Sequence, residues 1–116
     1  MNITLATLSQ ATAQQVFDSV AAHMLAQGKR AISEDLRMYR TPDGHKCGAG
    51  CLIGDDEYDP AFENKRWGNL VAEGLVPDAH VGLIASLQKV HDQRDALEWR
   101  TRLRDVAERH GLKVHF

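Results

Sequence analysis

Five side chains around a predicted tight turn have the types that bind anionic groups. Arginine offers a planar fork of N–H donors to a carboxylate or phosphate, and tyrosine can stack on a base or pack on an apolar rim. Because a rigid turn presents side chains at little entropic cost, this surface is predicted to bind a negatively charged ligand or partner. The predicted binding residues are Arg37, Tyr39, Arg40, His45 and Lys46. An exposed hairpin that merely caps the helices explains the same residues equally well.

Two cysteines four residues apart suggest a zinc site or a thiol nucleophile. A closed zinc site needs four ligands, but Cys47 and Cys51 supply only two. A nucleophilic thiol needs a nearby base or a positive environment, and these cysteines adjoin glycines and the apolar Leu52. Other candidate ligands are expected at the surface or at helix ends, namely His80, His91, His110 and His115. We therefore expect no metal, no cofactor and no catalytic residue, with both cysteines reduced and buried.

A run of acidic residues, Asp55, Asp56, Glu57 and Asp59, could hold a hard cation such as Mg²⁺ or Ca²⁺. The run lacks the central glycine and the terminal glutamate of an EF-hand loop. It precedes Pro60, and acidic residues before a proline favour the positive end of a helix. The spacing therefore predicts a helix start.

Five arginines gather in the last predicted helix and would form a basic stripe if no acidic residue opposed them. They are Arg94, Arg100, Arg102, Arg104 and Arg109. Glu98 precedes Arg102 by one helical turn, and Asp105 precedes Arg109 in the same way, which is the spacing of ion pairs. The formal net charge of −2 also lacks the surplus of cations that neutralises phosphates. Nucleic acid is therefore not expected as a partner.

Four segments have the apolar spacing and the end signals of helices. The first follows Thr12, which is predicted to form a capping box with Gln15, and ends at Gly28. Helices are predicted over residues 12–27, 77–92 and 95–111. Residues 59–73 are predicted to form a helix or two turns, and residues 48–53 favour a helical turn. The last helix is expected to direct four residues inward: Leu97, Leu103, Val106 and Ala107.

A β-hairpin is predicted between the first two helices. Residues 36–40 form its first strand, Thr41-Pro42-Asp43-Gly44 its turn, and residues 45–47 its second strand. Pro42 presets φ at the first central position of the turn, and Gly44 can take the left-handed conformation. Residues 114–116 could add a short C-terminal edge strand. The predicted fold class is α+β and mostly helical, with about four helices and one central β-hairpin.

The length and composition suit one domain. A chain of 116 residues with 43% hydrophobic residues can build one modest core, so residues 1–116 are predicted to form a single domain. Residues 1–8 lack the basic and apolar regions of a signal peptide, and no run of about 18 apolar residues occurs. We therefore expect a cytoplasmic protein without a disulfide or a membrane partner.

The segment around the turn resembles a family of small uncharacterised proteins of bacteriophages and prophages. The resemblance covers residues 10–92 and rests on a core of the form YR-x-PDG-x-KC-x-x-GC-L-I, here Tyr39 to Ile53, followed by DDEYDP at residues 55–60. A second motif, H-x-x-L-I-x-x-L-Q-x-x-H-D, spans His80 to Asp92. The resemblance implies a setting rather than an activity, because small phage proteins of this kind are commonly accessory factors that bind a host or defence component.

The expected function is that of a phage or prophage accessory protein in the cytoplasm of a bacterial host cell. It would bind a host or defence protein in an anti-defence role, or sequester a small anionic ligand such as a signalling nucleotide. The alternative is a small cysteine- or metal-dependent hydrolase that uses Cys51, a histidine and the acidic run. The sequence leaves a homo-oligomer open.

Overall fold

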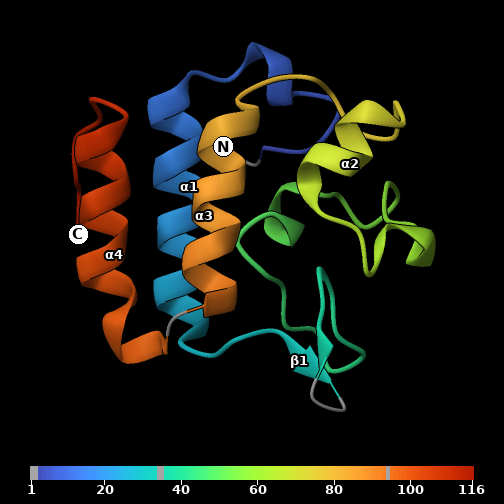
Figure 1. Ribbon diagram of the computed structural model, residues 1–116, viewed down its shortest axis with the longest axis horizontal. Coiled ribbons are helices and arrows are strands. Elements are labelled where there is room, and N and C mark those ends of the chain that lie inside the picture. Colours follow the sequence, from blue (N-terminus) through green and yellow to red (C-terminus); the bar gives the residue numbers. More distant parts are fainter. Residues whose placement is uncertain (1–2, 34–35, 94) are drawn as a thin grey trace.

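Helices build most of the protein, and three of them pack side by side (Figure 1). The computed structural model describes residues 3–33, 36–93 and 95–116, so Arg94 lies outside the described part of the chain. The helices α1 (Ala13–Gln27), α3 (Val81–Gln93) and α4 (Ala96–Arg109) contact one another, and the short α2 (Trp67–Ala72) packs against α3. Within these ranges, no helix is both long and apolar enough to cross a membrane.

The ends of α1 agree with the prediction. The Thr12 hydroxyl accepts the N–H of Gln15, and the Gln15 side chain accepts the N–H of Thr12, which completes the capping box. Gly28 ends the helix with a left-handed φ of 66°. The spacing of apolar residues predicts an inward stripe of six residues, and five of them are buried: Val16, Phe17, Val20, Ala21 and Met24. The sixth, Leu25, is partly buried.

The inward face of α4 is different from the predicted one. Leu103, Val106 and Ala107 are buried as expected, but Leu97 is 97% exposed and Trp99 is fully buried in its place. The Trp99 indole stacks on the ring of His91 at a centroid distance of 5.6 Å. Because Leu97 lies two residues before Trp99, it points to the opposite side of the helix.

Two of the predicted helices start or end elsewhere. Asp59 caps a 3₁₀ turn, η3 (Pro60–Phe62), as expected, but the helix predicted to continue to residue 73 is interrupted at Asn64, where φ is 65°. The third predicted helix begins at Val81 rather than near residue 77, because His80 has a φ of 55°. A left-handed residue cannot continue a right-handed helix.

The predicted α+β class with a central β-hairpin is wrong, and the protein is mostly helical without a sheet layer. The strands β1 (Ile32–Ser33) and β2 (Leu36–Arg37) pair over two residues each, before the predicted turn. Across that turn, the described residues form only an isolated bridge between Arg40 and Lys46. The ladder stops because the Tyr39 N–H donates to the Glu63 carboxylate instead of to a facing strand.

The turn itself forms. Gly44 has a φ of 90°, as predicted for a left-handed position, and its N–H donates to the carbonyl of Thr41 at 3.0 Å.

The C-terminal segment is not an edge strand either. Both backbone groups of Lys113 bond to the side chain of Gln14, so neither is available to a strand. Phe116 lies 6.4 Å from the ring centroid of Phe17 and packs on the helices instead.

The helical turn predicted over residues 48–53 is confirmed as a 3₁₀ turn, η2 (Gly50–Leu52). The backbone of this turn packs closely against the backbone of Tyr39. A Cβ atom on Gly50 would lie 2.0 Å from the carbonyl oxygen of Tyr39. That distance is far inside the contact distance of the two atoms, so only glycine fits without a movement of the loop.

We predict that Gly50→Ala destabilises the protein, whereas Gly82→Ala in α3 stabilises it. The first substitution forces the η2 turn away from Tyr39 and should cost about 1–3 kcal/mol or more. The second meets open space in a helix and should add roughly 0.5–1 kcal/mol. Urea unfolding of both variants measures the difference, and an unchanged midpoint for Gly50→Ala would contradict the close contact.

Candidate functional site

Arg40 has its guanidinium fixed close to the surface. Its Nη2 donates to the carbonyl of Ile53 at 2.9 Å, and its Cζ lies 4.9 Å from the ring centroid of Tyr58. Its Nη1 lies 2.9 Å from Oδ1 of Asp55, and the side chain is 18% exposed. Its Nε is buried without a hydrogen-bond partner in the described part of the chain. The guanidinium therefore has the Tyr58 ring on one face and its Nη1 beside the exposed Asp55.

Lys46 is positioned by α1 through its backbone. The Lys46 N–H donates to Gln27 Oε1 at 2.8 Å. The Lys46 carbonyl accepts from Gln27 Nε2 at 2.8 Å and from His23 Nε2 at 3.1 Å. These three bonds fix the start of the Lys46 side chain beside Arg40.

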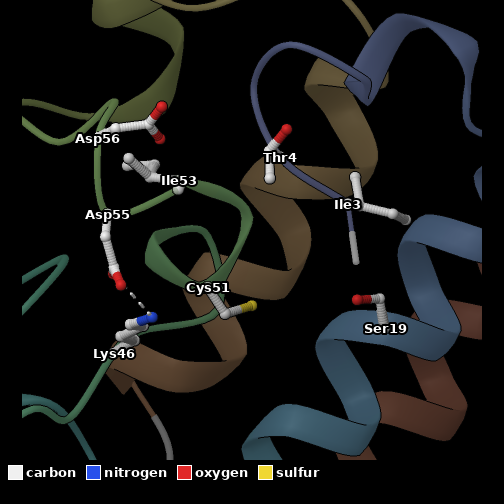
Figure 2. A pocket seen from close by; sticks show the side chains of 9 residues that line it. Ile3, Thr4, Ser19, Lys46, Cys51, Ile53, Asp55 and Asp56 are labelled. Carbon is white, nitrogen blue, oxygen red and sulfur yellow. Dashed lines mark ion pairs between the residues drawn. The ribbon is translucent and has the colours of Figure 1, made fainter. Parts of the chain in front are cut away.

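Asp55 joins the two cations. The Lys46 Nζ lies 3.8 Å from Oδ1 of Asp55, the same atom that Arg40 contacts (Figure 2). The Asp55 side chain is 88% exposed, so water screens both ion pairs and each contributes little to stability. Two cations thus converge on one position that a carboxylate oxygen occupies.

Tyr39 lies in the core rather than on the predicted binding surface. Its ring is 4% exposed and lies 6.3 Å from the ring centroid of Trp67. Its hydroxyl donates to the carbonyl of Lys65, and burial raises the pKa of that hydroxyl. Tyr39 therefore cannot stack on a ligand, and its substitution would disturb packing rather than a surface.

Of the other two predicted site residues, His45 is the one whose side chain is described, and it pairs with Asp43 rather than with Asp55. Nδ1 of His45 lies 3.3 Å from Oδ2 of Asp43, another residue of the turn segment. The side chain of Arg37 lies outside the part of the chain that the structure describes. Arg40 and Lys46 are the predicted residues that the structure brings together.

A polar hollow of about 530 Å³ adjoins Lys46 and Asp55 (Figure 2). Its lining includes the hydroxyls of Thr4 and Ser19, the thiol of Cys51 and the carboxylate of Asp56. The N-terminal wall is held by Glu57, whose carboxylate accepts the N–H groups of Leu5 and Ala6 at 2.9 Å each. The hollow offers hydrogen bonds of both kinds together with two negative charges and one positive charge.

The two cysteines differ in their surroundings. Cys47 is fully buried and its sulfur accepts the N–H of Gly50, whereas Cys51 is partly exposed and lines the hollow. Burial raises the pKa of Cys51 to about 12, although the nearby Lys46 lowers it somewhat. The thiol therefore stays protonated at neutral pH, which removes its nucleophilic form. The described residues contain no group of three or more side chains that could hold a metal ion.

Glu63 supports the site, and sequence reasoning did not find it. Its carboxylate accepts the N–H of Tyr39 at 2.9 Å, the N–H of Arg40 at 3.3 Å and the hydroxyl of Tyr58 at 2.6 Å. No motif in the sequence marks this residue, because the contact joins segments more than twenty residues apart.

His91 also supports the loop that carries the site. It lies in the last turn of α3, which agrees with the predicted helix-end position, and it is fully buried. Its Nε2 accepts the N–H of Ala31 at 2.9 Å, so Nδ1 carries the hydrogen and donates to Asp92 at 2.8 Å. Both ring nitrogens are thus occupied by structural contacts.

Comparisons of the chain with protein-family models, with curated proteins and with solved structures find no match.

The support that His23 gives to Lys46 predicts a pH dependence of stability. Burial lowers the pKa of His23 below its ordinary value of 6.5, against the effect of its hydrogen bond to the Lys46 carbonyl. The contribution of the neutral ring is therefore fully present above pH 6.5 and is lost as the pH falls through the lower folded-state pKa.

We expect His23→Gln, which retains a side-chain N–H donor, to flatten the dependence of the free energy of unfolding on pH below neutrality. Urea unfolding of both proteins at a series of acidic pH values measures the slopes. Equal slopes would show that His23 titrates alike in the folded and unfolded chains.

Proposed function

We propose that the protein is a phage or prophage accessory protein that acts by binding, and that Arg40 and Lys46 receive an acidic group of its partner. The single observation that supports this is their convergence on Oδ1 of the exposed Asp55. A carboxylate of the partner can take the place of Asp55 at that position. The proposed setting, the cytoplasm of a bacterial host cell, follows from the sequence resemblance.

The energetics of this exchange favour binding. The ion pairs of Asp55 are exposed, and such pairs contribute only about 0–1 kcal/mol each, so replacing Asp55 costs little. Arg40 is already ordered by Ile53 and Tyr58, so binding does not need to immobilise its side chain. An acidic group that excludes water from the site would gain a stronger, charge-assisted contact than Asp55 has.

A protein partner fits the site better than a nucleotide does. Asp55 and Asp56 both line the neighbouring hollow and would repel the several phosphate charges of a nucleotide. A single acidic side chain of a host or defence protein needs only the position between Arg40 and Lys46. The hydrolase alternative gains no support from the geometry, because the described hydrogen bond of the Cys51 thiol goes to the carbonyl of Gly48 at 3.5 Å rather than to a base.

The experiment compares the double variant Arg40→Ala/Lys46→Ala with wild type and with Arg102→Ala as the control. Each protein is expressed with an affinity tag in the bacterial host, and quantitative mass spectrometry measures which host proteins co-purify. We expect a host protein that wild type and the control retain equally and that the double variant loses by about tenfold or more, since two charge-assisted contacts are removed.

Circular dichroism must show that the double variant is folded. A folded double variant that retains the same host proteins at wild-type levels would contradict the proposal. Loss of a host protein from the control variant as well would assign the contact to charge in general rather than to this site.

A further inference from the structure

The outer face of α4 presents an apolar side chain to solvent. Leu97 is 97% exposed, whereas the described large apolar residues otherwise reach at most 42% exposure, at Leu75. The buried side of α4 is occupied by Trp99 and Leu103, so Leu97 takes no part in the core. A single exposed leucine is common on protein surfaces and needs a second observation to carry meaning.

The second observation is a pair of arginines on the same face. Arg100 and Arg104 both lie over the ring of Phe116, with their Cζ atoms 5.4 Å and 5.6 Å from its centroid. Both are exposed, and in the described part of the chain neither has an ion pair. Arg102 on the same helix differs, because it pairs with Glu98 at 3.8 Å and with Asp105 at 3.3 Å.

The Phe116 ring that orders the two arginines is itself held in place. It packs on Phe17 of α1, and the reciprocal bonds between Gln14 and Lys113 fix the segment that precedes it. A guanidinium that lies over a ring keeps its N–H donors directed outward in its own plane. Arg100 and Arg104 are therefore pre-organised donors without an acceptor in the described protein.

The three residues follow one helical line. Leu97, Arg100 and Arg104 stand at positions i, i+3 and i+7, the spacing by which one face of a helix enters a groove of a partner. Arg100 and Arg104 are also like charges at i, i+4, an arrangement that destabilises an isolated helix. An acidic partner would convert this repulsion into attraction.

We propose that α4 docks through Leu97, Arg100 and Arg104 into a groove of a protein partner that has an apolar floor and acidic edges. A protein fits better than a nucleic acid, because phosphates offer Leu97 no apolar contact and the net charge of −2 opposes general polyanion binding. This surface is independent of Arg40 and Lys46, since α4 and the segment around residues 40–47 lie on opposite sides of α1 and α3 (Figure 1).

The test uses an acidic random copolymer of glutamate and tyrosine as the probe, with poly-L-glutamate and heparin as comparisons. Fluorescence anisotropy at low salt measures binding to wild type, Leu97→Ala, Arg100→Ala/Arg104→Ala and the control Arg102→Ala. We expect the copolymer to bind wild type and the control alike, and the double variant to lose about tenfold or more in affinity. Leu97→Ala should weaken the binding of the copolymer but not the binding of poly-L-glutamate.

Several results would overturn the proposal. One is no binding of the copolymer to wild type, and another is an equal loss of affinity in Arg102→Ala. A third is heparin binding that is as tight as copolymer binding and is unchanged by Leu97→Ala. Sedimentation of wild type alone as a dimer that Leu97→Ala dissociates would assign the face to a second copy of the chain. A loss of binding in Leu97→Ala cannot be due to misfolding, because the Leu97 side chain is almost wholly in water.

Discussion

Bonds from helix side chains to loop backbone hold the irregular half of the protein in place, and the buried imidazole of His91 is the centre of this arrangement. It accepts the N–H of Ala31, donates to Asp92 and stacks on Trp99, so it joins α3, α4 and the chain that leaves α1. An unpaired buried N–H costs free energy comparable to a lost hydrogen bond. Between α1 and α2, strand pairing joins only two residues of β1 to two of β2, and side chains of the helices supply acceptors for further backbone amides.

The same device is repeated along the loop. Gln88 of α3 accepts the N–H of Ala49 at 2.9 Å and donates to Asp92, so Asp92 receives hydrogen bonds from both side chains. Further along the loop, Gln27 and Glu63 bind the backbones of Lys46 and Arg40. The candidate site therefore depends on Gln27 of α1, Gln88 of α3 and Glu63, and its rigidity comes from these contacts rather than from strand pairing.

This dependence explains which features the sequence predicts and which it does not. The capping box at Thr12 and the left-handed Gly44 are local, because each is set by residues within one turn of the chain. The hairpin prediction failed because strand-like residues lost their ladder to Glu63, a partner that lies far along the sequence. The closeness of Arg40 and Lys46 in sequence was enough to predict that they lie near each other. Their shared contact with Asp55 depends on the fold.

The residues of the second motif, which includes most of α3, also gain a physical meaning. The sequence places His80, Gln88 and His91 in one pattern, and each binds a backbone group of a distant segment. Leu97 was assigned to the wrong face because a helical spacing fixes which residues share a face but not which face is inward. Packing of Trp99 against His91 decides that choice.

Native-state hydrogen exchange at the amides of Ala31 and Ala49 tests the central claim most directly. Both lie in the loop, but their N–H groups bond to His91 and Gln88 of α3. We predict that they exchange only when the loop separates from α3, with protection approaching that of the amides within α3. Exchange of both amides at the rate of unprotected loop residues would contradict the view that α3 holds the loop and, through it, the site.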